Sequence, residues 1–337
     1  MLDIERNNNH TLQELLDLLQ GKKVYVQTHN FPDPDAIGAG FGMQQFLIRF
    51  GIDATLCYYG KIDRLNTKKM VDSLGIEIFS KDELTDMGEN DPIICVDSQK
   101  NNGNILDLIG DEVACVDHHP TAVPVDYFYK DVQMVGSCCT IVSKYYEDFN
   151  IQPDRMTATA LMYGLQMDTG GFTRGVTEGD VHAFGFLHPL ADHEILSKLE
   201  QNQLEFEDLQ AYGAAISSIQ VYDKIGVACI PFACPDALIA ITCDFILSLE
   251  EVDIAVVYSK RKDGYKFSVR AEGFLPNVDC GKMIAKTLEG IGSGGGHAYM
   301  AGGFVPMDGI GKLGNNPDEV LVERLVKAAA QLTGENG

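Results

Sequence analysis

An aspartate and two histidines, Asp117-His118-His119, directly follow the apolar run Val113 to Val116. Such a run is typical of a buried strand, so the three polar side chains are expected at its carboxyl end. In open α/β sheets that edge is where ligands bind. Adjacent residues at a strand end point in opposite directions, so we expect one imidazole to bind a metal ion and the other to face a substrate.

Two other apolar runs end in the same way. The run at 24–28 stops at His29, and the run at 93–96 stops at Asp97. If these strands are parallel neighbours of the run at 113–116, their ends bring imidazoles and carboxylates into one crevice. The alternative for Asp97 is a turn or a helix cap, which is the usual role of a lone Asp at a strand end.

His29 also begins the segment His29-Asn-Phe-Pro-Asp33-Pro-Asp35. Asp33 and Asp35 alternate, which suits ligation of two separate ions, and the prolines between them stiffen the loop. An Asp-Pro turn that caps the next helix is the alternative. The following glycines hint at a dinucleotide-binding loop, but Met43 interrupts G-x-G-x-x-G, and Gly-Lys-Ser/Thr does not occur.

A further carboxylate, Asp168, follows the apolar helix predicted at 156–167, and Gly170 and Gly171 would let backbone approach a ligand there. The predicted metal ligands are two histidines and four aspartates: His29, Asp33, Asp35, Asp97, His118 and Asp168. This mixture suits Mn²⁺ or Mg²⁺ better than a structural Zn²⁺, and the imidazoles favour Mn²⁺. Two such ions can clamp a phosphoryl oxygen and activate a water for in-line attack.

Strands and helices alternate along the first half of the chain. The pattern predicts strands at 24–28, 54–59, 76–79, 93–96 and 113–116, and helices at 39–50, 68–74 and 105–109. Further helices are expected at 140–149, 156–167 and 180–188. This order predicts an α/β fold whose N-terminal domain, residues 1–190, has a doubly wound, mostly parallel sheet.

A polar segment, residues 191–219, is expected to form a helical linker to a smaller α/β domain at 220–337. Strands are predicted there at 224–231, 253–259 and 265–270, and helices at 235–249, 279–288 and 317–332. A glycine-rich loop is predicted at 290–296, directly before His297.

Composition limits the partners. With 49 acidic and 26 basic side chains the net charge is −23, which excludes a broad electrostatic surface for long nucleic acid. No apolar run approaches the roughly 20 residues that span a bilayer, so no membrane partner is expected. The N-terminus is acidic and does not resemble a signal peptide. Nine scattered cysteines without a C-x-x-C pair suit reduced thiols in the cytoplasm.

The ordered set His29-x-x-x-Asp33-x-Asp35, Asp97, Asp117-His118-His119 and Asp168 resembles the DHH phosphoesterase superfamily. The stretch Gly292-Ser-Gly-Gly-Gly-His297, followed by Ala301-Gly302-Gly303, resembles the glycine-rich motif of the DHH-associated C-terminal domain. Length and layout are similar to the NrnA-type subgroup, which comprises nanoRNases, pAp phosphatases and phosphodiesterases of linear or cyclic dinucleotides. Pro34 stands where the family usually has glycine.

The resemblance implies a role for each residue of the set. One Mn²⁺ would be held by His29, Asp33 and Asp97. The other would be held by Asp35, Asp97, His118 and Asp168, with Asp97 bridging. His119 would contact the scissile phosphate, and Asp117 would orient a histidine, so Asp97, His119 and Asp117 are the expected catalytic residues.

The resemblance also implies a substrate contact in the C-terminal domain. Arg270 would bind the distal phosphate or base together with the backbone of Gly294, Gly295, Gly296 and His297. Consecutive backbone N–H groups can form an anion nest, and arginine can bind phosphate through two hydrogen bonds.

The function implied is a cytoplasmic, Mn²⁺-dependent phosphoesterase, in which two metals activate a water, with Mg²⁺ as the second choice. Its substrates would be short oligoribonucleotides of two to five nucleotides, linear dinucleotides of the pApA type, or pAp. The alternatives are a cyclic dinucleotide phosphodiesterase, an inorganic pyrophosphatase or exopolyphosphatase, and a non-catalytic nucleotide sensor. The glycine-rich His297 motif disfavours the pyrophosphatase. A homodimer is expected because the family often dimerises.

Overall fold

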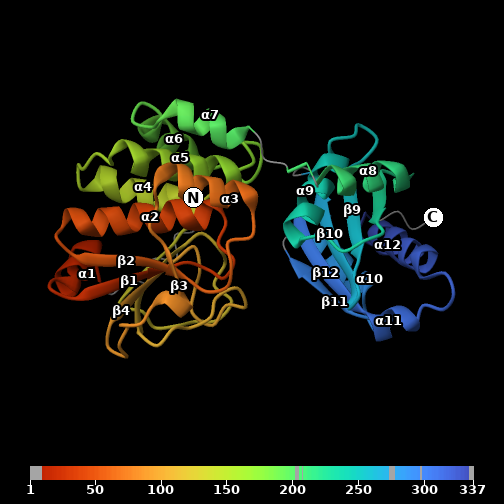
Figure 1. The fold of residues 1–337 in the computed structure, drawn as a ribbon, viewed down its shortest axis with the longest axis horizontal. Helices are drawn as coiled ribbons and strands as arrows, with labels where there is room; N and C mark the ends of the chain where they lie inside the picture. The colour runs from red at the N-terminus through yellow and green to blue at the C-terminus, as the bar shows by residue number, and fades with distance from the viewer. Residues whose placement is uncertain (1–9, 202–204, 207, 273–277, 297, 334–337) are drawn as a thin grey trace. The chain divides into compact units, whose positions relative to one another are not determined.

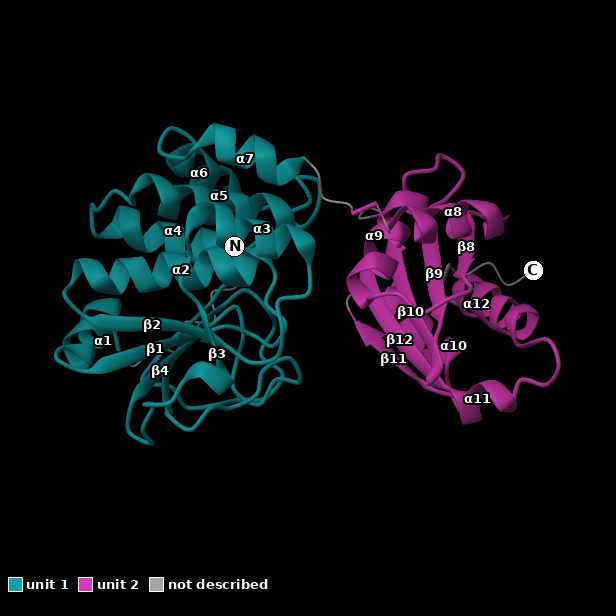
Figure 2. Cartoon of the chain, in the orientation of Figure 1, with its two compact units in different colours: residues 1–203 teal, residues 204–337 magenta. Residues whose placement is uncertain are grey.

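The computed structural model describes the chain apart from residues 1–9, 202–204, 207, 273–277, 297 and 334–337. The chain forms two compact units, residues 1–203 and 204–337, coloured separately in Figure 2. The boundary lies inside the predicted linker. That linker carries helix α7 (His193–Glu200), which contacts α3 and α5 of the first unit, and helix α8 (Asp208–Ser218), which contacts β8 and α9 of the second. Among the described residues, no helix is long and apolar enough to cross a membrane.

The first unit is built on six parallel strands in the order β3-β2-β1-β4-β5-β6. The strands are β1 (Lys23–Gln27), β2 (Asp53–Tyr58), β3 (Phe79–Ser80), β4 (Pro92–Val96), β5 (Asp111–Asp117) and β6 (Tyr129–Val132). The order reverses between β1 and β4, as in a doubly wound sheet, and so confirms the predicted fold class. The crevice at this reversal is the expected place for a ligand.

Helices cover one face of this sheet, as Figure 1 shows for α2, α4 and α5. The helices of the first unit are α1 (Leu12–Leu19), α2 (Pro34–Arg49), α3 (Leu65–Leu74), the 3₁₀ helix η1 (Lys81–Glu83), α4 (Cys138–Asp148), α5 (Arg155–Asp168), α6 (Glu178–Leu187) and α7. Buried apolar side chains of α1, α2, α4, α5 and α7 form one core with Val24, Val26 and Ile94 of the strands.

Helices α2 and α5 pack unusually closely because glycines face the contact. A Cβ added at Gly38 would lie 2.6 Å from the carbonyl oxygen of Ala160, and one at Gly164 would lie 2.8 Å from that of Pro34. No side chain fits at these separations, so only glycine allows the approach. The contact brings the beginning of α2, with Asp35, close to α5, whose last residue is Asp168.

The opposite face of the sheet is covered by irregular chain. Ile105 and Leu108 are buried against Tyr25, Ile93 and Cys115. The predicted helix at 105–109 is therefore wrong. The backbone there bonds to side chains instead: the Gln27 amide donates to the Leu106 carbonyl at 2.7 Å, and the Leu106 N–H donates to the Asn30 side chain at 3.0 Å. Strand β6 was not predicted, and the strand predicted at 76–79 is shortened to Phe79–Ser80.

The second unit has a mixed sheet in the order β11-β12-β10-β9-β8-β7, in which β8 and β9 are parallel and the other neighbours antiparallel. The strands are β7 (Gln220–Tyr222), β8 (Ile225–Ile230), β9 (Ile254–Lys260), β10 (Gly264–Ala271), β11 (Ser293–Gly296) and β12 (Met300–Pro306). The helices are α8, α9 (Asp236–Leu247), α10 (Cys280–Thr287), α11 (Met307–Gly311) and α12 (Pro317–Thr333). Helices α8 and α9 pack on one face, and α10 and α12 on the other.

The glycine-rich segment predicted as a loop is an edge strand over Ser293–Gly296 instead. Its glycines allow α10 to approach. A Cβ on Gly281 of α10 would lie 2.4 Å from the Gly296 carbonyl oxygen, and one on Gly294 would lie 3.0 Å from Ile284. Close packing thus explains part of the glycine content that sequence reasoning assigned to a ligand loop.

Candidate metal centre

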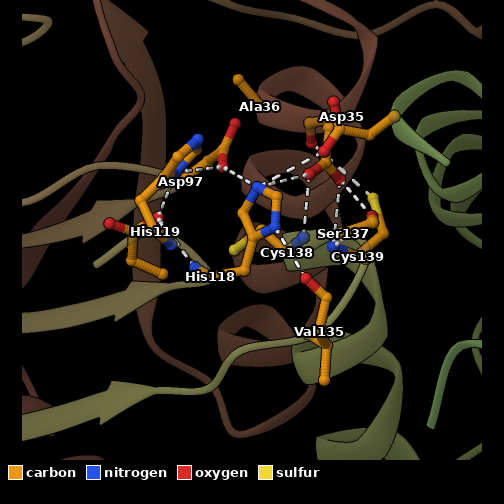
Figure 3. Close-up of polar contacts among 12 residues, drawn as sticks. Asp35, Ala36, Asp97, His118, His119, Val135, Ser137, Cys138 and Cys139 are labelled. Atoms are coloured by element: carbon orange, nitrogen blue, oxygen red, sulfur yellow. Dashed lines mark hydrogen bonds and ion pairs between the residues drawn. The ribbon is translucent and has the colours of Figure 1, made fainter. Parts of the chain in front are cut away.

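The strand ends and two helix ends bring all six predicted ligands together. His29 and Asp97 follow β1 and β4, and His118 follows β5. The ligand atoms form three overlapping groups, in each of which they lie within 4.8 Å of one another: His29, Asp33 and Asp97; Asp35, His118 and Asp168; and Asp97, His118 and His119. Figure 3 shows Asp35, Asp97 and the two adjacent histidines around this point.

His29 faces two carboxylates. Its Nε2 lies 3.5 Å from Asp97 Oδ2 and 3.8 Å from Asp33 Oδ1. Its Nδ1 lies 2.8 Å from the Asn30 carbonyl, which can only accept, so Nδ1 carries a proton and Nε2 is the nitrogen that can bind a metal ion after losing its own proton. Burial opposes charge on this ring, but Asp33 and Asp97 raise the pKa of His29 to about 9.

Asp33 caps α2 and is also placed for the metal-ligand role that the sequence left open. Its Oδ1 accepts the N–H groups of Asp35 and Ala36 at 3.1 and 3.2 Å and so caps α2, while the same carboxylate faces His29. Burial alone would raise its pKa, but the contact with His29 lowers the pKa of Asp33 well below its usual range. A capping carboxylate is fixed in orientation, which suits a preorganised ligand.

His118 faces three carboxylates. Its Nε2 lies 3.3 Å from Asp97 Oδ1, 3.4 Å from Asp168 Oδ2 and 3.6 Å from Asp35 Oδ2. Its Nδ1 lies 3.1 Å from the carbonyl of Val135, which again places the proton on Nδ1. Burial would lower the pKa of His118, but the carboxylates of Asp97, Asp35 and Asp168 raise it well above its usual value.

Asp97 lies between the two histidines, with one oxygen toward each. Its backbone is in the left-handed region at φ 57°, which costs a non-glycine residue on the order of 1 kcal/mol. Its Oδ1 is buried and has no hydrogen-bond partner in the described part of the chain. Burial, and then the charge of Asp35, raise the pKa of Asp97 to about 6 and that of Asp168 to about 8.

These observations fit a pair of divalent cations. Four carboxylates crowd around two imidazole nitrogens, and burial, followed by the charge of Asp35, raises the pKa values of Asp97 and Asp168. A buried carboxylate oxygen without a donor is unfavourable unless a cation compensates it. Oxygen-rich donor sets with imidazole suit Mn²⁺ and Mg²⁺. Burial raises the pKa of Cys138 and Cys139 well above the usual value, so neither resembles a reactive thiol.

His119 differs from His118 in exposure and partners. Its side chain is 31% exposed, against 10% for His118. Its Nδ1 lies 2.9 Å from Asp117 Oδ1, an oxygen that also accepts the N–H of His118 at 2.8 Å. Burial opposes both shifts, but this contact lowers the pKa of Asp117 and raises that of His119. Gln99, which the sequence did not single out, donates to Asp117 Oδ2 at 2.7 Å.

Asp35 is held by the beginning of α4, a support that the sequence did not predict. Ser137 Oγ and the Cys139 N–H donate to Asp35 Oδ1 at 2.6 and 3.1 Å, and the Cys138 N–H donates to Oδ2 at 2.8 Å. A helix N-terminus stabilises a carboxylate in this way. The available signal was Ser137 itself, an N-cap residue type three residues before the helix predicted at 140–149 and directly before the observed α4.

A buried carboxylate anchors the segment that supports both His118 and Asp35. Asp180, in the first turn of α6, accepts the Gly136 N–H at 2.9 Å and the Thr140 hydroxyl at 2.6 Å. It also accepts the N–H and the hydroxyl of Thr177, both at 2.7 Å. Gly136 lies between Val135, which contacts His118, and Ser137, which contacts Asp35. Asp180 therefore fixes the backbone behind two of the candidate ligands.

The predicted substrate residues lie in the second unit. Strand pairing sets Gly296 of β11 and Val269 of β10 opposite Ala301 of β12, so Arg270 and Gly296 are at the same end of the sheet. The Arg270 guanidinium is bonded to Asp244 at 3.0 Å and to Ser268 Oγ at 3.1 Å. His297 lies outside the described residues. The remaining histidines stay apart from the metal ligands: His182 contacts Glu147, and His193 contacts the His188 carbonyl.

Comparisons with known proteins identify the family of both domains. The model of the DHH family, N-terminal domain, matches residues 23–165, and that of the DHHA1 domain matches residues 223–336. An uncharacterized protein of Methanocaldococcus jannaschii is 27% identical over 307 residues, which are 90% of this chain and 62% of that protein. The cyclic-di-AMP phosphodiesterase GdpP of Geobacillus thermodenitrificans is 26% identical over 322 residues, covering 86% of this chain and 45% of that protein.

This chain thus spans less than two thirds of the length of either relative. Among solved structures, an exopolyphosphatase-related protein from Bacteroides fragilis superposes with a TM-score of 0.73 at 19% identity, covering 96% of this chain and 97% of that one. The likeness to that structure concerns the fold. The two family models together match most of the chain, one in each compact unit. The chain therefore belongs to the DHH phosphoesterase superfamily, with a DHH domain followed by a DHHA1 domain.

Proposed function

We propose that this chain is an NrnA-type phosphoesterase that uses two divalent cations, with Mn²⁺ preferred, to hydrolyse short nucleotide phosphodiesters or pAp. The observation that carries the proposal is Asp97, a buried carboxylate with one oxygen toward His29 and the other toward His118. An oxygen-rich site with two such halves suits a pair of metal ions. The proposal includes a cytoplasmic location, in agreement with nine free cysteines, and a homodimer.

The chain's own residues have distinct tasks in this proposal. His29, Asp33 and Asp97 would hold one ion, and Asp35, Asp97, His118 and Asp168 the other. Bound there, the ions would polarise a phosphoryl oxygen and lower the pKa of a water. His119, whose Nδ1 proton is directed at Asp117, would present the rest of its ring to the scissile phosphate. Asp117 thereby fixes the orientation of His119.

A dinucleotide substrate is favoured over inorganic pyrophosphate by the second domain. The DHHA1 match covers residues 223–336, and the glycine-rich strand with Arg270 would contact the distal phosphate or base. The relative named as a cyclic-di-AMP phosphodiesterase supports cyclic dinucleotides as the second candidate substrate class. The net charge of −23 restricts anion binding to local sites, which agrees with short substrates.

The proposal is tested with the purified protein, assayed with Mn²⁺ and with Mg²⁺. The panel is pAp, pApA, a pentanucleotide, cyclic di-AMP and pyrophosphate. We expect Mn²⁺-dependent release of mononucleotide from pAp or pApA and its loss in His118→Ala. His182→Ala, which removes an exposed histidine that contacts Glu147, is the matched control and should stay active. Hydrolysis of pyrophosphate alone, or full activity of His118→Ala, would contradict the proposal.

A further inference from the structure

Arg174 is an arginine that has no partner among the described residues. Among the arginines whose side chains the structure describes, six have a hydrogen bond or an ion pair: Arg49, Arg64, Arg155, Arg261, Arg270 and Arg324. The guanidinium of Arg174 has neither within the described part of the chain, and its Nε is buried. The chain has 49 acidic side chains, so the lack of a carboxylate here is unusual.

The backbone of Arg174 is held next to the segment that follows the candidate ligand Asp168. Its backbone N–H donates to the carbonyl of Thr169, the residue directly after Asp168, at 2.9 Å. The guanidinium lies over Gly170: a Cβ added there would be 3.1 Å from Nε and 3.4 Å from Cζ. Gly170 has a φ of 57°, so both its backbone conformation and the space above it favour glycine. The sequence had predicted that Gly170 lets a ligand approach; the structure shows the Arg174 guanidinium there.

An unpaired, half-buried guanidinium is unfavourable on its own. Removing one of its N–H groups from water without an acceptor costs roughly 1–3 kcal/mol. The planar fork of arginine matches two oxygens of a phosphate, and its charge persists at all pH values of interest. The acceptor that completes Arg174 is therefore expected to be an anion that the described residues do not supply. A phosphate group at the neighbouring metal centre is such an anion.

We propose that Arg174 is a substrate-binding residue that contacts a non-bridging oxygen of the phosphate at the metal centre. The inference rests on the proposed phosphoesterase function and deepens it. Arg174 is the cationic residue nearest to the candidate ligand Asp168 in the sequence. The inference assigns Arg174, rather than Arg270 of the second unit, to the phosphate group that is cleaved. Arg270 already has a carboxylate partner in Asp244, and Arg174 does not.

The test compares Arg174→Gln and Arg174→Lys with Arg155→Gln. Arg155 is the first residue of α5, at the opposite end from Asp168; its side chain is 63% exposed and pairs with Asp192. Binding of inorganic phosphate is measured by calorimetry on the Mn²⁺-loaded protein, next to Mn²⁺ affinity and steady-state kinetics on pApA. The phosphate measurement does not require turnover.

We expect Arg174→Gln to weaken phosphate binding and to raise KM by about 10- to 100-fold, the range of a charge-assisted hydrogen bond, with Mn²⁺ affinity unchanged. Arg174→Lys should recover part of this loss, and Arg155→Gln should match the wild type. Unchanged phosphate affinity in Arg174→Gln would overturn the inference, as would an equal loss of Mn²⁺ affinity. If the wild type binds phosphate more tightly than Arg174→Gln but cleaves no ester, the proposed function is refuted, while the role of Arg174 in phosphate binding stands.

Discussion

The candidate metal centre of the first unit and the cations of the β9–β10 hairpin in the second unit differ in how their charges are satisfied. In the first unit, carboxylates face one another, and Asp97 Oδ1 and Arg174 Nε lack hydrogen-bond partners among the described residues. In the second unit, four cations of the β9–β10 hairpin have carboxylate partners: Arg261 and Lys266 pair with Asp236, Lys260 with Asp318, and Arg270 with Asp244. Within these pairs, Arg261 Nε and Asp318 Oδ1 are the buried atoms without a hydrogen bond to the described residues. Unsatisfied charge marks the place where a ligand is needed, and paired charge marks a stable surface.

The largest expected effect comes from removing the carboxylate shared by both halves of the centre. Asp97→Ala should reduce phosphoester hydrolysis by about 10³-fold or more, the scale of losing a main electrostatic contribution to the transition state. Steady-state kinetics and Mn²⁺ stoichiometry measure it. Asp244→Ala, which unpairs Arg270 in the second unit, is the counterpart and should leave the stoichiometry unchanged. If Asp97→Ala still bound two Mn²⁺ ions, the contrast drawn between the charges of the two units would be wrong.

A variant of Asp180 tests whether metal binding depends on the hydrogen bonds that hold the backbone behind the candidate ligands, as well as on the ligands themselves. Asp180→Asn keeps the size but weakens acceptance of the Gly136 N–H and the Thr140 hydroxyl, so the backbone at 135–137 is less fixed. We expect Mn²⁺ affinity to fall by about 10- to 100-fold, as for other partners of metal ligands. Asp192→Asn alters a comparable helix cap away from the centre, on α7, and serves as the control. Equal metal affinity in the two variants would assign Asp180 to stability alone.

The pH dependence of metal binding follows from the raised pKa values. Without metal, Asp97, Asp168 and His29 have pKa values of about 6, 8 and 9, so each is partly or fully protonated at or below its value. Ligands must lose these protons to bind a cation, so binding releases protons and affinity increases with pH. We expect about a tenfold gain per pH unit for each proton released. Calorimetry in buffers of different ionisation enthalpy counts the protons, and pH-independent affinity between 6 and 9 would contradict the pKa values.

Arg270 is expected to give the smallest effect. Its guanidinium is 14% exposed and already bonded to Asp244, so a substrate phosphate must compete with that carboxylate. Arg270→Gln should raise KM for pApA by less than about tenfold and should spare bis-p-nitrophenyl phosphate. The two substrates are compared under the same metal conditions. An equal loss on both would show that Arg270 is not a contact to the distal part of the substrate.

Sequence reasoning reached three of the candidate ligands because each follows the end of an apolar run. His29, Asp97 and His118 follow β1, β4 and β5, and parallel strands must end at one edge. It did not reach Gln99, Val135 or Asp180, because a hydrogen bond between residues far apart in the chain leaves no periodic pattern. The residue roles themselves stay proposals.

The errors have a common cause in tertiary packing. The segment 105–109 has apolar spacing, but Gln27 and Asn30 take its backbone hydrogen bonds and Ile105 is needed to cover the sheet. The glycines at 294–296 suggested a flexible loop, whereas they form part of a strand in which Gly294 faces Ile284 of α10 and Gly296 closely approaches Met300 and Ala301 of β12. In both cases, contact with a segment far away in the sequence outweighed the local structural preference, and the sequence alone does not show where that segment lies.

We expect the close contact of α2 with α5 also to influence the size of the ion that the candidate metal centre accepts. Asp35 belongs to the first turn of α2 and Asp168 ends α5, so the span between their carboxylates depends on how closely the two helices approach. That approach depends on Gly38 and Gly164, neither of which is among the candidate ligands. A methyl group at Gly38 would push the helices apart and widen the cage, shifting preference from small cations such as Mg²⁺ and Mn²⁺ toward Ca²⁺, whose bonds to oxygen are longer. Ion selectivity is thus encoded partly in residues that touch no ion.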